Sequence, residues 1–137
     1  MNEKMENSFP GENIIIQPML EIQAELILGI KKDAVFGPII VCGLGGIYTE
    51  IFKTVEFFIP PMNTEEIKKR LAKSKLGFLF KETRGQKPYN IENLAGIILK
   101  LAQLAIEIRE IKEFDINPLL IYNNGKETKA VDIKIII

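Results

Sequence analysis

Toward its C-terminal end the chain carries two apolar, β-prone runs on either side of Asn124-Gly125. Such a pattern predicts a β-hairpin, because both central residues of a type I′ turn need positive φ, which Asn and Gly tolerate. The two predicted strands cover residues 114–121 and 128–136. A two-residue turn sets Asn123 opposite Lys126, and counting along both strands then fixes the facing pairs. The turn therefore predicts which residue of one strand lies opposite each residue of the other.

The predicted register places Asn117 opposite Asp132, and Asp115 opposite Lys134. Because side chains alternate between the faces of a strand, Asp115 and Asn117 share one face, about 7 Å apart. Oxygen ligands beside an ammonium group are the chemistry of a magnesium–phosphate site. The alternative is a solvated polar face, with Asn117-Pro118 starting a turn. Pro118 removes one backbone donor and marks an edge or a bulge, and a bulge would shift this register.

Composition limits the classes of partner. The chain has 137 residues, with 18 basic and 18 acidic side chains and a net charge of zero. One domain with its own core is expected at this length. A balanced charge gives no reason to expect nucleic acid or an anionic membrane as a partner. No apolar run approaches the roughly 20 residues that would span a bilayer.

Cysteine and histidine usage limits the chemistry. The single Cys42 forms no internal disulfide, which suits a reducing cytoplasm, and we expect a cytoplasmic protein. Without histidine the chain builds neither a Ser-His or Cys-His nucleophile nor a phosphohistidine. Residues 1–13 are polar and contain Pro10-Gly11, so we expect a flexible lead-in without a signal peptide.

The remaining pattern predicts an α+β fold, with two main helices packed on one face of a largely antiparallel sheet. The first three strands are expected at 14–19, 24–30 and 35–42, with a turn at 31–33, and the third is apolar enough to be buried on both faces. A fourth strand is expected at 51–59, a helix at 65–73 and an irregular segment at 75–89. Asn63 or Thr64 caps the first helix, with Glu66 completing a capping box. Asn90 caps a longer helix that reaches about Ile111, with apolar residues at the 3.6-residue period.

Glycines after the third strand form a second candidate site. Backbone amides around Gly43, Gly45 and Gly46 can approach phosphate oxygens, because glycine adopts the positive φ values of an anion-binding nest. The alternative is an ordinary glycine turn after a buried strand. Glu50 follows, either to hold a metal-bound water or a cationic partner, or as a solvated strand end. Glu25 lies in an apolar strand, so it belongs either to an edge or to a site.

Several motifs together resemble one family. They are Ile16-Gln17-Pro18-Met19, the stretch from Glu25 to Asp33, Phe36-Gly37-Pro38, the stretch from Gly43 to Glu50, Arg84-Gly85, Asp115-Ile116-Asn117-Pro118-Leu119 and Val131-Asp132. In this order they resemble the ATP-grasp region of ADP-forming acyl-CoA synthetases, the acetate–CoA ligase beta subunit and relatives of succinyl-CoA synthetase. The resemblance covers residues 14–137 and is with the C-terminal half of the ATP-grasp fold.

The resemblance implies a function. Such enzymes interconvert acyl-CoA, ADP and phosphate with the free acid, CoA and ATP, through an acyl phosphate and a phosphohistidine. It implies Mg²⁺ and ATP or ADP as cofactors. Asn117 and Asp132 would hold Mg²⁺ with Asp115 adjacent, and Glu25 would line the nucleotide cleft. Gly43, Gly45 and Gly46 would approach the phosphates, with Glu50 as the catalytic residue nearby.

The resemblance also implies partners. The first half of the fold and the histidine-bearing, CoA-binding and acyl-transferring subunit would come from elsewhere, and self-association through an apolar sheet face is expected. The alternative is a non-catalytic remnant of the fold that serves as an assembly or regulatory module.

Overall fold

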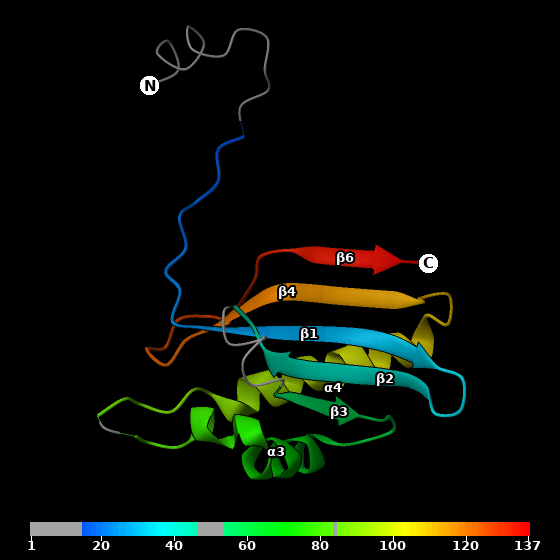
Figure 1. Ribbon diagram of the computed structural model, residues 1–137, viewed down its shortest axis with the longest axis horizontal. Helices are drawn as coiled ribbons and strands as arrows, with labels where there is room; N and C mark the ends of the chain where they lie inside the picture. The colour runs from blue at the N-terminus through cyan, green and yellow to red at the C-terminus, as the bar shows by residue number, and fades with distance from the viewer. Residues whose placement is uncertain (1–14, 47–53, 84) are drawn as a thin grey trace, which may run out of the picture.

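The computed structural model describes residues 15–46, 54–83 and 85–137. These residues form one sheet with helices packed on one of its faces (Figure 1). The six strands are β1 (Ala24–Asp33), β2 (Gly37–Leu44), β3 (Val55–Phe58), β4 (Glu113–Ile121), β5 (Lys129–Ala130) and β6 (Ile133–Ile136). Their order is β3-β2-β1-β4-β5, with β6 also paired to β4, and every ladder is antiparallel. The predicted α+β arrangement is confirmed.

The core lies between the sheet and its helices. In β1 the alternate residues Leu26, Leu28 and Ile30 are buried against the helices, as a period-2 pattern requires. The alternate residues Glu25, Ile27, Gly29 and Lys31 therefore face the other side of the sheet. No helix of the described residues covers that second side (Figure 1). It is the uncovered face of the sheet.

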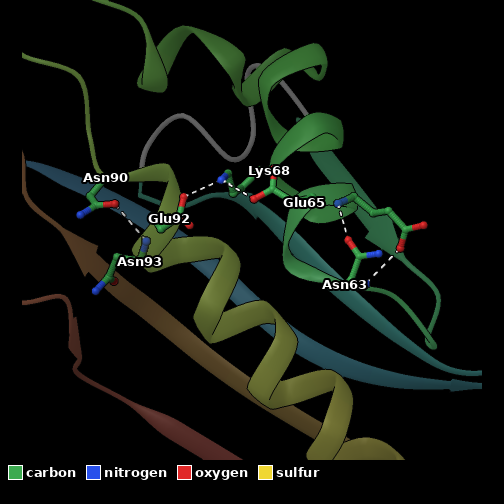
Figure 2. Close-up of polar contacts among 7 residues, drawn as sticks. Asn63, Glu65, Lys68, Asn90, Glu92 and Asn93 are labelled. Atoms are coloured by element: carbon green, nitrogen blue, oxygen red, sulfur yellow. Dashed lines mark hydrogen bonds and ion pairs between the residues drawn. The ribbon is translucent and has the colours of Figure 1, made fainter.

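Helix α3 (Thr64–Lys73) begins as the sequence predicts. Asn63 is its N-cap: the Asn63 Oδ1 accepts from the Glu66 backbone N–H at 2.9 Å. The Glu66 carboxylate accepts from the Asn63 N–H at 3.0 Å, which completes the capping box (Figure 2). Two otherwise unpaired backbone donors are thereby satisfied.

Helix α4 (Ile91–Glu107) is capped by Asn90 and joined to α3 by one lysine. The Asn90 Oδ1 accepts from the Asn93 N–H at 3.0 Å. The Lys68 ammonium on α3 lies 2.7 Å from carboxylate oxygens of both Glu65 and Glu92 (Figure 2). Hydrogen bonds to Glu65 and then Glu92 raise the pKa of Lys68. The lysine thus tethers the two helix N-termini.

None of the helices in the described ranges is long and apolar enough to cross a membrane.

The predictions for four strands differ from the structure. Residues 15–19 of the expected first strand are exposed and belong to no strand. β1 continues through the expected turn and ends at Asp33. The Asp33 carboxylate accepts from the Val35 and Phe36 N–H groups at 2.8 and 2.9 Å, so the turn lies after Asp33. β2 ends at Leu44 and has one uncovered side, so it is not buried on both faces. β3 occupies only Val55–Phe58 of the expected strand, whose residues 51–53 lie outside the described part.

Two further segments differ from the prediction. The segment expected to be irregular begins with a 3₁₀ helix, η1 (Lys75–Phe80), in which the Ser74 hydroxyl oxygen accepts from the Leu76 N–H at 3.0 Å. α4 ends at Glu107, short of Ile111, with Ile108 as its C-cap. The expected flexible lead-in at 1–13 lies outside the described residues.

We predict that Asn63→Ala lowers the free energy of unfolding by about 1 kcal/mol, because the cap hydrogen bond is lost. Urea denaturation followed by circular dichroism measures the change. Lys69→Ala is the control, since Lys69 is exposed on the same helix and makes none of these cap contacts. Equal stability of the two variants would contradict the assigned cap.

Candidate functional site

The predicted hairpin register is confirmed. Asp115 pairs with Lys134 across β4 and β6, and Leu119 pairs with Ala130 across β4 and β5. The Asn117 N–H donates to the Asp132 carbonyl oxygen at 3.1 Å, as the same counting requires. The ladder between β4 and β5 ends at the pair of Leu120 and Lys129, so the connection is wider than the two-residue turn that was expected.

Pro118 affects the other side of β4. Along β1, Leu26 pairs with Leu119 and Leu28 with Ile116, so β4 has one residue more than β1 in this interval. This is a β-bulge, and it accommodates the missing proline donor without disturbing the hairpin register. Ile116 and Leu119 both face the core, which leaves Asn117 exposed between them.

Asp115 lies on the uncovered face beside a glycine. Its partner in β1 is Gly29, and a Cβ built on Gly29 would lie 3.5 Å from the Asp115 Oδ1 and 2.7 Å from the Phe114 carbonyl oxygen. Glycine at this position therefore keeps β1 and β4 close and leaves the Asp115 carboxylate room. Lys134 is the cross-strand neighbour of Asp115 but forms no ion pair with it.

Glu25 and the glycines form the second cluster. The Gly45 N–H donates to the Glu25 carbonyl oxygen at 2.8 Å, which extends the β1–β2 pairing by one residue. Gly46 has a φ of 66°, and a Cβ built there would collide with the Glu25 Oε2. Because β1 pairs on both sides, Glu25 is not on an edge strand. Its half-buried carboxylate lies on the uncovered face, over the glycines.

Two other predicted site residues, Gly43 and Glu50, are not part of these two clusters as the structure describes them. Gly43 lies within β2, where a Cβ would meet the Thr54 carbonyl oxygen at 3.0 Å, so packing of β3 already accounts for glycine there. Glu50 lies outside the described residues. The glycine cluster and the hairpin oxygens occupy different positions along β1, since Gly45 lies beside Glu25 and Asp115 lies beside Gly29.

Sequence reasoning missed a clamp at the far end of the hairpin. The Tyr122 hydroxyl donates to the Glu21 carbonyl oxygen at 2.8 Å, and the Lys126 ammonium pairs with the Glu21 carboxylate. The Asn123 N–H donates to the Gln23 Oε1 at 3.0 Å. The ion pair with Lys126 lowers the pKa of Glu21 and raises that of Lys126. These partners are about a hundred residues apart in sequence, so no local pattern announces them.

A polar pocket of about 820 Å³ adjoins the clamp. Its lining combines amide side chains, glycine backbone, a lysine and a tyrosine: Gln23, Gly85, Gln86, Lys87, Tyr89, Asn123, Asn124 and Gly125. The Asn123 Nδ2 donates to the Lys87 carbonyl oxygen at 2.9 Å, which joins the loop before α4 to the hairpin. The pocket therefore lies at the end of the sheet where β1 begins.

The hairpin donor set fits a hard divalent cation only in part. In the described ranges, no three carboxylate, cysteine or histidine side chains gather as a metal cluster. Asp115, Asn117 and Asp132 offer two carboxylates and one amide. Mg²⁺ is usually bound by one or two carboxylates together with waters and substrate phosphates. The set therefore fits a magnesium ion that arrives with a nucleotide better than one held by protein alone.

Comparison with known proteins shows which family this chain is similar to. The profile of the ATP-grasp domain matches residues 1–137. The chain is 42% identical over 124 residues to the beta subunit of acetate–CoA ligase (ADP-forming) I of Pyrococcus furiosus, covering 90% of this chain and 53% of that relative. It is 38% identical over 124 residues to 4-hydroxybutyrate–CoA ligase (ADP-forming) of Nitrosopumilus maritimus, covering 90% of this chain and 18% of that one. The chain thus spans about half the length of its beta-subunit relative.

Solved structures similar to this chain come from enzymes of the same kind as these relatives. The apo form of the dinucleotide-forming acetyl-coenzyme A synthetase 1 of Ca. Korarchaeum cryptofilum matches with a TM-score of 0.79 and 32% identity, covering 99% of this chain and 63% of that chain. The same enzyme in complex with coenzyme A and Mg-AMPPCP, its phosphohistidine segment pointing towards the nucleotide-binding site, matches with a TM-score of 0.77. That match has 32% identity and covers 86% of this chain and 55% of that one.

We predict that Gly29→Ala destabilises the fold by about 1–3 kcal/mol, because the added Cβ overlaps the Phe114 carbonyl oxygen and forces β4 away from β1. Gly96→Ala on α4 is the matched control. A Cβ there meets nothing within 4 Å, so the helix should gain up to about 1 kcal/mol. Thermal or urea unfolding distinguishes the two, and a neutral Gly29→Ala would contradict the close approach of β1 and β4.

Proposed function

Because this chain belongs to the ATP-grasp family, we propose that it forms the magnesium- and phosphate-binding part of an ADP-forming acyl-CoA ligase of the acetate–CoA ligase type. One observation carries the proposal: the register sets Asp115 opposite Lys134 and joins the Asn117 N–H to the Asp132 carbonyl oxygen, so the three proposed ligands occupy neighbouring positions of one hairpin. That pairing follows from the turn and the strand pattern, independently of any relative.

In this proposal the hairpin holds Mg²⁺. The Asp115 and Asp132 carboxylates and the Asn117 amide oxygen supply protein ligands, and nucleotide phosphates supply the rest. When bound, the ion neutralises charge on the transferring phosphoryl group, which is most of what catalysis of this reaction requires. Lys134, adjacent to Asp115 and without an ion pair to it, adds a further positive charge toward the phosphates.

The glycine cluster has the complementary role. Gly46 is exposed and has the positive φ of an anion-binding nest, so a phosphate is proposed to approach the backbone there, with the buried Gly45 beside it. In this proposal Glu25 lines the nucleotide cleft beside them, and Gly43 lies two residues earlier, near the end of β2. Glu50, which follows in sequence, is proposed to act near the transferring phosphoryl group.

The phosphoryl group passes between the nucleotide and a phosphohistidine in this proposal. Residues 1–137 contain no histidine, so that residue must come from a partner segment that also carries the CoA-binding and acyl-transferring functions. A known relative is a beta subunit, which supports a multi-chain assembly. The reaction would interconvert acyl-CoA, ADP and phosphate with the free acid, CoA and ATP.

The uncovered face supports a second contact. Val55 and Phe57 of β3 are 40% and 52% exposed there, next to the half-buried Val41 of β2. Apolar side chains on an open sheet face indicate a binding surface. We assign this surface to the other half of an ATP-grasp fold, so that the nucleotide lies between the two halves.

Isothermal titration calorimetry tests the proposal. We expect ADP to bind with magnesium and at least about tenfold more weakly without it, because the phosphates complete the metal's ligand set. Asp132→Ala and Asn117→Ala should remove the magnesium-dependent part of the affinity. Glu127→Ala is the control, since Glu127 is an exposed acidic residue of the same hairpin outside the ligand set.

The titration is done on this chain and again with the acyl-transferring partner chains added. Binding that appears only with partners, and still requires Asp132, would support a site completed at an interface. Unchanged magnesium dependence in Asp132→Ala would overturn the metal assignment. Absence of nucleotide binding under both conditions would instead favour a non-catalytic member of the family.

A further inference from the structure

The Asn124-Gly125 pair, from which the hairpin was predicted, has a second chemical property. It is the only Asn-Gly pair in the 137 residues. The backbone nitrogen of the residue after an asparagine can attack the asparagine carboxamide, and glycine obstructs this attack least because it has no Cβ. Asparagine counts among the thermolabile residue types. The sequence thus singles out Asn124 among the asparagines, and the structure decides whether it is free to react.

The fold leaves this pair exposed and its peptide nitrogen unengaged. Asn124 and Gly125 are both exposed, in the connection between β4 and β5, where residues 122–128 belong to no strand. In the described part of the chain, the Gly125 N–H donates no hydrogen bond. A Cβ built on Gly125 would meet nothing within 4 Å, so the space around the nitrogen is open. The attacking group is therefore neither buried nor held by a partner.

The Asn124 side chain is held in a ring with that nitrogen. Its Oδ1 accepts from the Lys126 backbone N–H at 3.2 Å, and the ring that this hydrogen bond closes contains both the Asn124 Cγ and the Gly125 nitrogen. Attack on the Cγ places negative charge on the same Oδ1. Because a donor already points at this oxygen, the developing charge is stabilised as it is in an oxyanion hole.

The other described asparagines lack this combination. Each is followed by a residue with a side chain, and the one before Pro118 has no following N–H at all: Asn63, Asn90, Asn93, Asn117 and Asn123. In Asn63 and Asn90 the Oδ1 is engaged by the N–H groups of a capped helix. The Asn123 carboxamide donates to the Lys87 carbonyl oxygen at 2.9 Å. Among the described asparagines, only Asn124 joins a glycine successor to an unengaged peptide nitrogen.

We propose that Asn124 converts spontaneously to aspartate and isoaspartate in the folded chain, with water as the only co-reactant. The Gly125 nitrogen gives its proton to solvent and bonds to the Asn124 Cγ. The bond from Cγ to Nδ2 breaks, and Nδ2 takes a proton and leaves as ammonia, so a cyclic imide (a succinimide) remains. Water then opens the imide. Cleavage between the Cγ and the Gly125 nitrogen gives aspartate, and cleavage between the Asn124 backbone carbonyl carbon and that nitrogen gives isoaspartate.

The conversion changes the charge of the polar pocket. Asn124 and Gly125 both line that pocket, and Lys87 is the one charged side chain among its described lining residues. An aspartate or isoaspartate carboxylate is ionised at neutral pH. The reaction therefore replaces a neutral amide by a negative charge in a pocket whose described lining otherwise carries a positive one. Because ammonia is lost, the change is irreversible and accumulates with time.

Peptide mass spectrometry of the aged, folded chain tests the proposal. Trypsin releases residues 113–126 as one peptide, in which Asn117 and Asn123 are internal controls. After incubation at mildly alkaline pH, Asn124 should gain the mass of a hydrolysed amide at least about tenfold sooner than either control, because glycine obstructs the attack least. Isoaspartyl methyltransferase should label the product, since opening of the imide at the backbone carbonyl is what makes isoaspartate.

Gly125→Ala is the matched variant. Its Cβ obstructs the attacking nitrogen and should slow the conversion at least about tenfold. The variant residue is strained at a φ of 83°, so circular dichroism must first show that the variant is folded. The comparison of Asn124 with Asn117 and Asn123 in the unaltered chain does not depend on this variant.

Four results would each overturn the proposal. They are modification of Asn123 before Asn124, a product that contains aspartate without isoaspartate, and an undiminished rate in folded Gly125→Ala. The fourth is an Asn124 that stays an amide in the folded chain while a synthetic peptide of residues 113–126 converts, because the fold would then protect the pair.

Discussion

The pairing between β4 and the C-terminal strands is the constraint on which the candidate site depends. A shift of one residue would turn Asp115 toward the helices and bring Ile116 to the uncovered face. The observed register instead buries Ile116 and Phe114 and leaves Asp115 beside Lys134. The hydrophobic core therefore fixes where the polar residues lie. In this sense the proposed magnesium ligands are positioned by the packing of their apolar neighbours.

Two local features distinguish the sheet at the candidate site. The bulge at Asn117-Pro118 adds one residue to β4 relative to β1 without changing the hairpin register. Glycines at positions 29, 45 and 46 remove side chains where a Cβ would meet backbone or a carboxylate. Gly29 and Gly45 are themselves buried and Gly46 is exposed, so Asp115 and Glu25 pack closely against this strip of the sheet.

Much of this could be predicted from the sequence, because the decisive signals are local. The Asn-Gly turn and the alternating strands predicted the hairpin register, and Asn63 with Glu66 predicted the start of α3. The end of β1 could not be predicted in this way: Lys31 and Lys32 look like a turn, and the strand continues because its neighbours β2 and β4 pair with it. Tertiary pairing overrode local composition there.

Other features depend on contacts between distant parts of the chain. The clamp between Glu21, Tyr122 and Lys126 joins residues about a hundred positions apart, and neither end has a recognisable pattern. The close approach that requires glycine at position 29 is set by β4, which is distant in sequence. The ATP-grasp resemblance supplied the proposed roles of Glu25 and the glycines, which their spacing alone left open between a site and an ordinary turn.

The most direct measurement is paramagnetic relaxation by Mn²⁺, used in place of Mg²⁺ with ADP and detected by NMR on the labelled chain. The account predicts that amide signals of Asp115, Asn117 and Asp132 broaden first, followed by those of Gly45 and Gly46. Signals from the β1–β2 turn at residues 34–36, at the other end of β1, should persist. Broadening that is strongest elsewhere, or that does not depend on ADP, would contradict a nucleotide-linked metal site on this hairpin.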